Sequence, residues 1–578
     1  MADFTRAGHA ACRKQLRPCG RETILFKRLR DVGGIRPGAN LGHVAIEVSH
    51  RLLQLLPPES LLNNTRAAVL LADAIDQKLR MLIVADYDAD GATGCAVGVK
   101  GLRMLGAQVE YLVPNRLEHG YGLTPEIVRL AAARKPDLLI TVDNGIAAVE
   151  GVAEAKRLGI PVLVTDHHLP GDALPDAICI VNPNQSGCTF ASKNLAGVGV
   201  MFYVLLALRA EQRQRGVYAN TPEPDLRELL DLVALGTIAD VVKLDTNNRT
   251  LVSQGLARMR AGKAAPGINA LFHAAGADPR CATVFDLGFK LGPRLNAAGR
   301  IDDMALGIEC LLADETAALQ LAQRLNALNL ERRDIESDMQ DEALAALADF
   351  KPDDCSGLCA YQPGWHIGVI GILASRLKDK FHRPTVVFAS NGAGELKGSG
   401  RSIPGLHLRD ALDLIAKRHP GLVLKFGGHA MAAGLSIPEH RYAEFKQAFD
   451  IVTSELLSPA DLEGLLETDG ELALDAHSYA FAQQLENAIW GQAFPAPLFI
   501  GDFQVQSQRV LKEKHLKLTL LRDGLRFDAM HFFHPDKPGY KHPEPLPERI
   551  RAVYALMTNE YNGNQTLQLR LQHWEARE

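Results

Sequence analysis

Short apolar runs alternate with amphipathic stretches between residue 66 and residue 165. Residues 67–80 have the spacing of a helix, and residues 81–85 are a short apolar run typical of a strand. Thr124 followed by Pro125 indicates the start of a further helix. The alternation predicts helices at 96–106, 124–136 and 147–159, and strands at 108–114, 137–142 and 161–165. Because these strands are apolar throughout, we expect a parallel sheet covered by helices on both faces.

Residues 315–349 have a different pattern, a long helical stretch without glycine or proline. The stretch is charged on one side and carries leucine and alanine on the other, which favours a rigid connector helix between two domains. A coiled-coil dimer arm is the alternative, although the heptads are irregular. A second α/β pattern follows and continues to residue 455.

The C-terminal region reads as short alternating strands at 498–533 and 549–574, separated by a proline-rich loop at 534–548. A small antiparallel barrel of the OB type fits this pattern. Basic and aromatic residues interleave there: Arg509, Lys512, Lys514, Lys517, Arg522 and Arg526 with Phe503, Phe527, Phe532 and Phe533. They are interpreted either as a cationic groove with stacking platforms for single strands, or as core phenylalanines and a solvated strand edge.

A chain of 578 residues is too long for one hydrophobic core, so several domains are expected. The patterns predict five segments: an N-terminal segment (1–65), an α/β domain (66–314), a connector helix (315–349), a second α/β domain (350–456) and the barrel (457–578). The start of the chain is basic, through Arg6, Arg13, Lys14, Arg17, Arg21, Lys27, Arg28 and Arg30. Such a segment is either a flexible arm on nucleic acid or a merely solvated terminus.

The composition is that of an ordinary globular protein and excludes few classes of function. The chain is 47% hydrophobic and 23% charged with a net charge of −5, so any nucleic-acid surface has to be local. The sequence has no apolar run that would span a bilayer and no secretory signal, and no membrane association is expected. Among nine scattered cysteines, Cys355 and Cys359 lack a matching second pair, which argues against a zinc site. Reduced thiols in a cytoplasmic protein are the simplest interpretation.

Acidic side chains and histidines follow the predicted strands. The stretch "VADYDADGATG" at 84–94 places Asp86, Asp88 and Asp90 directly after the strand at 81–85. Asp143 follows the strand at 137–142, Asp166, His167 and His168 follow the strand at 161–165, and Asp240 ends the helical stretch 226–240. Because the carboxyl ends of parallel strands lie at one edge of a sheet, we expect these groups to converge there.

Five of these aspartates and the two histidines, gathered at one edge, repel each other unless cations lie among them. Carboxylates with a minority of imidazoles favour Mn²⁺ or Mg²⁺, and two such ions about 3.5–4 Å apart support in-line displacement at phosphorus. The pattern therefore predicts metal-assisted hydrolysis of a phosphoester or phosphoanhydride, with His168 donating to a phosphoryl oxygen. Taken singly, each aspartate also fits an ordinary turn.

The motifs "DYDADG", "DNG" and "DHH" resemble the DHH phosphoesterase superfamily. Within it, the chain resembles the RecJ family of bacterial single-strand-specific exonucleases from about residue 80 onward. The motifs that carry this resemblance are "YLVPNRLEHGYG", "NLAGVGV", "LGTIADVVKL", "GPRLNAAGR", "GWHIGVIGILASRL", "GSGRSI" and "FGGHAMAAG". The resemblance implies a DHH domain, a DHHA1-type substrate-binding domain and an OB-fold domain.

The resemblance also implies an activity, 5′→3′ degradation of single-stranded DNA in recombination and repair with two divalent ions, Mn²⁺ or Mg²⁺. Six residues then look like metal ligands: Asp86, Asp88, Asp90, Asp143, His167 and Asp240. Asp143 looks like the bridge between the two ions, and His168 looks catalytic.

Eight further residues are predicted to contact DNA. Arg294, Asn296 and Arg300 suit a backbone phosphate, or alternatively a structural loop between domains. The resemblance implies that Ser399 and Arg401, together with Arg116, form a pocket for the 5′-terminal phosphate. Tyr121 is a candidate for stacking on a base, and His429 for a substrate-facing loop; a packed tyrosine and a helix-start histidine are the alternatives.

Partners are expected from the same resemblance: single-stranded DNA, a helicase, and a single-strand-binding protein. We expect a monomer. Two other functions stay open at this point. One is a phosphodiesterase or pyrophosphatase of the DHH superfamily acting on small nucleotides, and the other is an inactive scaffold that binds single-stranded DNA.

Overall fold

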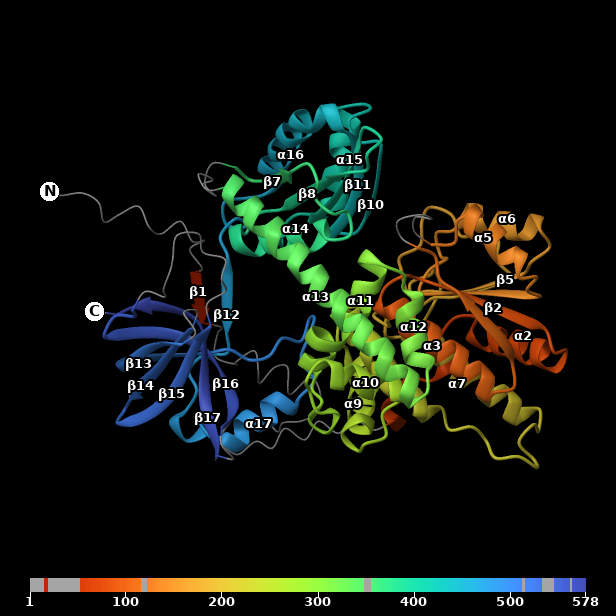
Figure 1. The fold of residues 1–578 in the computed structure, drawn as a ribbon, viewed down its shortest axis with the longest axis horizontal. Helices are drawn as coiled ribbons and strands as arrows, with labels where there is room; N and C mark the ends of the chain where they lie inside the picture. The colour runs from red at the N-terminus through yellow and green to blue at the C-terminus, as the bar shows by residue number, and fades with distance from the viewer. Residues whose placement is uncertain are drawn as a thin grey trace.

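The computed structural model describes residues 15–18, 52–115, 122–347, 355–511, 515–532, 545–561 and 564–577. Figure 1 shows a larger α/β domain continued by a group of helices, a smaller α/β domain above it, and a β-barrel on the opposite side. One long helix, α13 (Glu315–Ala346), runs from the larger to the smaller α/β domain. The basic residues predicted before residue 31 lie outside the described side chains.

The larger domain is built on a five-stranded parallel sheet in the order β3-β2-β4-β5-β6. Its strands are β2 (Arg80–Ala85), β3 (Gln108–Leu112), β4 (Leu138–Val142), β5 (Val162–Thr165) and β6 (Cys179–Val181). Ile83 packs in the core on one face and Leu82 and Val84 in the core on the other, which is why the strands read as continuously apolar. The three-residue strand β6 is too short to give a periodic signal.

Helices cover both faces of this sheet. One face carries α2 (Asn64–Asp76), α3 (Ala89–Met104) and α7 (Gly197–Gln214), and the other carries α5 (Pro125–Ala133) and α6 (Val149–Arg157). The predicted start of α5 is confirmed, because Thr124 Oγ1 accepts a hydrogen bond from Ile127 N at 3.3 Å.

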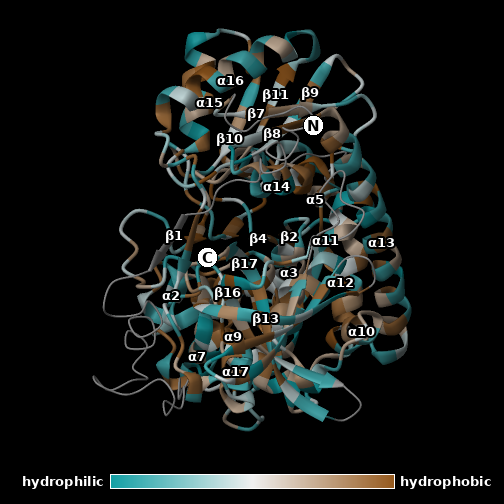
Figure 2. Ribbon diagram, turned by 90° about the vertical axis from the view of Figure 1, so that its left-hand side faces the viewer, coloured by the Kyte–Doolittle hydropathy of each residue, from teal (hydrophilic) through white to brown (hydrophobic). Residues whose placement is uncertain are grey.

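A group of helices completes the larger domain. It comprises α8 (Leu230–Ala239), α9 (Thr246–Arg260), α10 (Pro266–Ala274), the short π-helix η6 (Asp286–Leu291), α11 (Gly292–Ile301) and α12 (Ala305–Leu312). Helix α13 packs against α10, α11 and α12, and further along against α14 (Ile370–Phe381) of the smaller domain. Hydrophilic and hydrophobic residues alternate along α13, as expected of a helix with one buried face (Figure 2). The stretch is therefore an intramolecular connector.

The smaller α/β domain has a mixed sheet in the order β10-β11-β9-β8-β7, parallel only between β7 and β8. The strands are β7 (Leu358–Tyr361), β8 (Thr385–Ser390), β9 (Glu395–Arg401), β10 (Lys425–Gly428) and β11 (Ala432–Pro438). Helix α14 packs on one face, whereas α15 (Leu408–Arg418) and α16 (Tyr442–Leu456) pack on the other.

The C-terminal region closes into a five-stranded barrel in the order β13-β14-β15-β17-β16. Its strands are β13 (Phe499–Leu511), β14 (His515–Arg522), β15 (Leu525–Phe532), β16 (Arg549–Tyr561) and β17 (Asn564–Ala576). Strands β15 and β17 pair in parallel, so the barrel is not fully antiparallel. Phe503 and Phe527 lie in the barrel core, whereas Phe532 is exposed; Lys512, Lys514 and Phe533 lie outside the described residues.

Helix α17 (Tyr479–Asn487) packs against β16 and β17. Ahead of it, β12 (Leu465–Thr468) pairs in parallel with β1 (Gln15–Pro18), which brings the start of the chain beside the barrel. The predicted fold class is confirmed: a parallel-sheet α/β domain joined by a long helix to a second α/β domain, with a C-terminal barrel. The residue boundaries of the five segments stay a prediction.

Candidate metal centre

Side chains from four separate segments meet at the carboxyl edge of the parallel sheet. Asp86 follows β2, Asp143 follows β4, His167 follows β5, and Asp240 is the C-cap of α8. Nε2 of His167 lies 3.1 Å from Oδ1 of Asp143, 3.5 Å from Oδ2 of Asp240 and 3.9 Å from Oδ2 of Asp90. Residues as distant in the sequence as Asp86 and Asp240 therefore form one cluster.

All seven residues predicted for the metal site belong to this cluster. Three sets have ligand atoms within 4.8 Å of one another: Asp86, Asp88 and Asp143; Asp90, His167 and Asp240; and Asp143, His167 and His168. Asp143 and His167 each belong to two of the sets and so lie at the centre. The arrangement has enough oxygen and nitrogen ligands for more than one hard divalent cation.

The buried polar atoms at the centre fit such cations. Asp143 is 2% exposed, yet its Oδ1 has no hydrogen-bond partner among the residues the structure describes. Nε2 of His167 also has no hydrogen-bond partner in the described part of the chain, although it lies 3.1 Å from Oδ1 of Asp143. Buried polar atoms normally have partners, so this pair of atoms has the character of unfilled ligands.

The electrostatics show the cost of gathering these groups without a cation. Burial, followed by the charge of Asp88, raises the pKa of Asp90 to about 7. Burial and the charges of neighbouring aspartates raise the pKa values of Asp143 and Asp240 well above their usual range. A bound cation reverses this balance, because it favours the ionised form of each carboxyl group.

The two adjacent histidines differ. Burial, and then the charge of His168, lowers the pKa of His167 to about 4, so its ring is neutral and available as a ligand. Burial alone would lower the pKa of His168 as well, but the hydrogen bond to Asp166 and the charges of Asp166, Asp86 and Asp88 raise it to about 9. His168 therefore carries a proton at neutral pH.

Asp166 belongs to the same edge of the sheet, although the sequence analysis assigned it no role in the site. It is buried, and its Oδ1 lies 2.8 Å from Nδ1 of His168 while accepting hydrogen bonds from the backbone N–H groups of His167 and His168. Its Oδ2 accepts a hydrogen bond from Ile146 N. Its place at the end of β5, directly before the two histidines, was the available signal.

The backbone holds the cluster tightly. Both oxygens of Asp90 accept hydrogen bonds from the first turn of α7, at 2.6 Å from Gly197 N and 2.9 Å from Val198 N. A Cβ atom on Gly197 would lie 2.6 Å from Cβ of Asp143, so only glycine fits there. Asp143 and Val241, the residue after Asp240, have φ values of 63° and 61°. Strained conformations of this kind concentrate at functional sites.

Helix α11 connects the cluster to its surroundings. It carries three of the eight residues predicted to contact DNA, Arg294, Asn296 and Arg300. Oδ1 of Asn296 accepts a hydrogen bond from Ala89 N at 2.9 Å. Nε of Arg294 donates to Oδ1 of Asn326 on α13, and Nη1 of Arg300 donates to Gly368 O of the smaller domain at 3.1 Å. These side chains join the acidic loop, the connector helix and the second domain.

Ser399 and Arg401 lie on β9 of the smaller domain, where they alternate with buried Gly398 and Gly400 and so share a face. Nη1 of Arg401 donates to Oγ of Ser399 at 3.2 Å. A Cβ on Gly371, in the first turn of α14, would lie 3.0 Å from Oγ of Ser399 and 3.1 Å from Nη2 of Arg401. A helix N-terminus thus faces a serine and a guanidinium, a combination suited to an anion.

His429 follows β10 and is exposed. Burial and the charges of His168, Arg409 and His407 lower its pKa, so His429 lies within electrostatic reach of the cluster from the other domain. Arg116 and Tyr121 lie outside the described residues.

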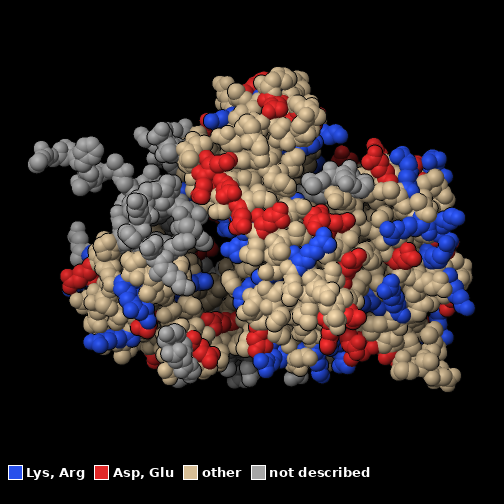
Figure 3. Space-filling view, in the orientation of Figure 1, with Lys and Arg blue, Asp and Glu red and all other residues tan. Residues whose placement is uncertain are grey.

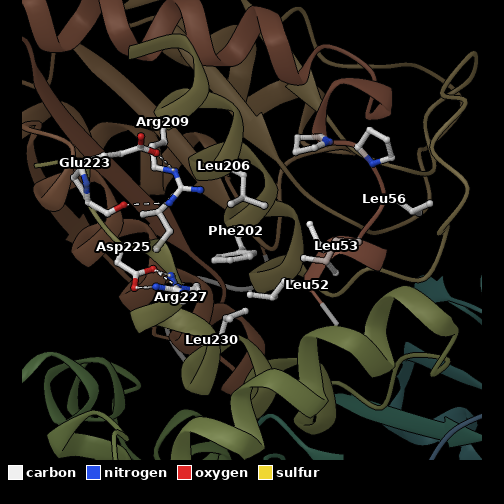
Figure 4. Close-up of a pocket in the computed structure, with 15 residues that line it drawn as sticks. Leu52, Leu53, Leu56, Phe202, Leu206, Arg209, Glu223, Asp225, Arg227 and Leu230 are labelled. Carbon is white, nitrogen blue, oxygen red and sulfur yellow. Dashed lines mark hydrogen bonds and ion pairs between the residues drawn. The ribbon is translucent and has the colours of Figure 1, made fainter. Parts of the chain in front are cut away.

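A separate cavity of about 570 Å³ lies at the other end of α7 and α8 (Figure 4). Its apolar side is formed by Leu52, Leu53, Phe202, Leu206 and Leu230, and its polar side includes the ion pairs Arg209–Glu223 and Arg227–Asp225. Leu230 begins α8 and Asp240 caps its end, roughly 15 Å away at 1.5 Å per residue. This cavity is therefore not part of the acidic cluster.

The outer surface of the connector helix α13 is acidic. Figure 3 shows acidic side chains gathered over the connector helix on this face of the molecule. The exposed acids of α13 include Glu331, Asp334, Asp338, Asp341 and Glu342. A polyanion would be repelled from this outer surface of the connector.

Comparison with known families defines the class of protein. The sequence model of the DHH family, N-terminal domain, matches residues 80–237, and that of the DHHA1 domain matches residues 354–455. The parallel sheet with its acidic edge is therefore a DHH domain, and the mixed sheet is a DHHA1 domain. A third model, the RecJ OB domain, matches residues 468–573, which include the barrel.

Curated relatives narrow the class to one family. The chain is 49% identical over 560 residues to the single-stranded-DNA-specific exonuclease RecJ of Salmonella typhimurium, covering 94% of each chain. It is 48% identical to RecJ of Escherichia coli, again over 94% of each chain, and 33% identical to RecJ of Thermus thermophilus, over 89% of this chain and 70% of that one. The chain belongs to the RecJ family.

Solved structures of RecJ proteins also match this chain. A crystal structure of RecJ in complex with Mn²⁺ from T. thermophilus matches with a TM-score of 0.77 at 28% identity, over 98% of this chain and 80% of that one. A crystal structure of exonuclease RecJ bound to manganese matches with a TM-score of 0.58 at 35% identity, over 70% of this chain and 97% of that one. Among the helices of the described residues, none is long and apolar enough to cross a membrane.

Proposed function

We propose that this chain is a 5′→3′ exonuclease that hydrolyses single-stranded DNA in recombination and repair, using two divalent ions. The observation that carries the proposal is the convergence of five aspartates and two histidines, with unfilled buried ligand atoms at the centre, at one sheet edge. The relatives and solved structures named above, which are single-strand exonucleases and manganese complexes, support the same activity.

The ligands of the two ions follow from the three sets of atoms in the cluster. One ion would be held by Asp86, Asp88 and Asp143, and the other by Asp90, His167 and Asp240, with Asp143 shared between them. Bound there, two Mn²⁺ or Mg²⁺ ions would activate water and stabilise charge on the phosphoryl oxygens in an in-line displacement.

His168 would hold and donate a proton at the scissile phosphate. Its Nδ1 is engaged by Asp166 at 2.8 Å, which fixes the ring and leaves Nε2 as the atom that can reach a substrate oxygen. The raised pKa keeps the ring cationic, so it would also stabilise developing negative charge. Asp166 is a positioning residue in this scheme.

The direction of digestion would be set by an anion site in the DHHA1 domain. Ser399 and Arg401, beside the N-terminus of α14, would bind the 5′-terminal phosphate together with Arg116. A terminal phosphate held at a fixed distance from the ions places one particular phosphodiester bond over them.

Other predicted contacts would guide the strand between these two points. Arg294, Asn296 and Arg300 would line the backbone path on α11, and His429 and Tyr121 would contact the leading nucleotides. The bond from Arg300 to Gly368 holds the two domains in contact beside this path. The proposal includes a passage between the domains that admits one strand and excludes a duplex.

The proposal includes a monomer in the cytoplasm that receives its strand from a helicase and contacts a single-strand-binding protein. The seven cysteines in the described part of the chain are free thiols, which supports a reducing compartment. Light scattering of the purified chain tests the monomer, and pull-down of each partner class tests the contacts.

The function is tested with oligonucleotides labelled at either end, in Mn²⁺. We expect 5′-phosphorylated single strands to be shortened from the 5′ end, blunt duplexes to be resistant, and Asp143→Ala to bind the strand without hydrolysing it. Shortening from the 3′ end would overturn the proposed polarity. Hydrolysis of cyclic dinucleotides alone would identify a small-nucleotide phosphodiesterase, and strand binding by an inactive wild-type chain would identify a scaffold.

A further inference from the structure

Two exposed phenylalanines form a stacked pair at the π-helix η6: Phe289 lies within it, and Phe285 is its N-cap. Phe285 is 55% exposed and Phe289 is 72% exposed, and their ring centroids lie 4.9 Å apart with an angle of 23° between the planes. Only one other phenylalanine in the described residues, Phe532, is strongly exposed. Single exposed apolar residues are normal, but a contiguous pair of aromatic rings in water indicates a binding surface.

The pair lies next to the acidic cluster. A Cβ on Gly288 would lie 3.3 Å from Cγ2 of Ile238, and a Cβ on Gly292 would lie 3.2 Å from Cβ of Ala239. The segment that carries the two rings is therefore packed against the last turn of α8, one or two residues before Asp240. Turns of π-helix are rare and are frequent at functional sites.

The surroundings of the pair are cationic. Asp286 is neutralised by Lys290, whose Nζ lies 2.7 Å from its Oδ1. Nη1 of Arg294 donates to Lys290 O at 2.6 Å, so this guanidinium is attached to the same turn. Burial, and then the charge of Arg333 on α13, lowers the pKa of Arg294, so a second guanidinium is close by. Arg294 thus adds one positive charge beyond the ion pair, beside two exposed aromatic rings.

Aromatic faces flanked by guanidinium groups are the means by which proteins hold single-stranded nucleic acid without reading its sequence. From these observations we propose that Phe289, supported by Phe285, is a base-stacking platform that holds the single strand beside the metal centre. The proposal rests on the proposed exonuclease function and adds a contact to the bases, whereas Arg294 and Arg333 would meet the phosphates. Phe285 acts through Phe289 by holding its ring in place.

The test compares Phe289→Ala with Phe289→Tyr, which keeps the ring, and with Val217→Ala, an exposed apolar residue in the loop after α7. KM and kcat are measured on a 5′-phosphorylated single strand in Mn²⁺. We expect Phe289→Ala to raise KM about fivefold to a hundredfold with kcat within twofold of wild type. Phe289→Tyr and Val217→Ala are expected to keep the wild-type KM.

A second measurement assigns the effect to the bases. Strands in which internal nucleotides are replaced by abasic sites should bind more weakly to the hydrolysis-deficient Asp143→Ala chain. With Phe289→Ala added, abasic and normal strands should bind alike, because the stacking partner is already lost. Such non-additivity between protein and substrate changes measures their direct coupling.

The outcomes distinguish failure of the exonuclease proposal from failure of the stacking platform. If the wild-type chain fails to digest single strands, the exonuclease proposal falls and this one falls with it. If the wild type is active and Phe289→Ala has the same KM and the same loss on abasic strands, only the stacking platform is overturned. A KM raised equally by Phe289→Ala and Phe289→Tyr would also contradict it, because a stacking contact tolerates tyrosine.

Discussion

The two α/β domains place opposite kinds of chemistry at their sheets. In the DHH domain all strands are parallel, so the carboxyl ends of β2, β4 and β5 meet, and buried acids crowd together there. In the DHHA1 domain the sheet is mixed, and β9 presents Ser399 and Arg401 on one face while two glycines face the core. The first arrangement suits cations and the second suits an anion.

The difference shows how a substrate that is itself a polyanion can be handled. In the proposed scheme, the acidic edge would bind phosphate only with metal ions between them, whereas the guanidinium of Arg401 would bind phosphate directly. If the two sheets divide the work in this way, changes at the acidic edge of the DHH sheet should act on metal binding and on kcat. Changes in the DHHA1 domain should act mainly on KM.

The largest effect is expected from His168→Ala. Loss of a positioned proton donor should lower kcat about a hundredfold to ten-thousandfold while Mn²⁺ binding is retained, because His168 is not among the six predicted ligands. Steady-state hydrolysis and calorimetric titration with Mn²⁺ measure the two quantities. His273→Ala, an exposed histidine on α10, is the matched control and should behave as wild type. Loss of Mn²⁺ binding in His168→Ala would instead make it a ligand.

Metal binding should also be visible in stability. At a Mn²⁺ concentration about 100 times its dissociation constant, binding to the native state contributes about 2.7 kcal/mol, which corresponds to a rise in Tm of about 5–10 °C. Asp143→Asn should lose most of this rise, because Asp143 belongs to two of the ligand sets. Differential scanning calorimetry with and without Mn²⁺ provides the measurement. An equal shift in both proteins would place the ions elsewhere.

Arg401→Ala tests the other domain. Loss of a charged hydrogen-bond donor should raise KM for 5′-phosphorylated strands about tenfold to a hundredfold, with kcat nearly unchanged. The preference for a 5′-phosphate over a 5′-hydroxyl should disappear, which competition assays measure. Lys397→Ala lies on the same face of β9, two pleats away, and should keep the preference. A drop in kcat without a change in KM would contradict the division of work.

The smallest effect is expected from Asn296→Ala, which lies where the domains are joined. Removal of its Oδ1 leaves Ala89 N without its partner, so the acidic loop should loosen and kcat/KM should fall about fivefold. Hydrogen exchange at Ala89 and steady-state kinetics measure the two consequences. Asn269→Ala on α10 is the control, because among the described residues its side chain bonds only to the nearby Ala264 O. Unchanged exchange at Ala89 would show that Asn296 does not hold the loop.

Much of the DHH domain could be predicted because its signals are local. Continuously apolar runs identify buried strands, Thr124 and Pro125 mark a helix start, and Asp86 and Asp143 follow strands directly. One topological rule then places all strand ends at one edge, so the cluster of carboxylates could be expected from the sequence alone. The DHHA1 sheet offered weaker signals, because a mixed sheet has no common edge at which side chains must meet.

What the sequence determined by itself was the alternation of elements, the connector helix, and the set of acids and histidines at the strand ends. Only the tertiary structure decided how these groups are held. In the folded chain, Asp166 is buried and bonds to His168, and Asp90 bonds to the first turn of α7. Arg294 bonds to α13, and Arg300 bonds to the second domain. The tertiary structure also left Phe285 and Phe289 exposed beside Asp240. The physical reason is that burial and hydrogen bonding between distant segments depend on how helices pack, and the local pattern carries no information about that packing.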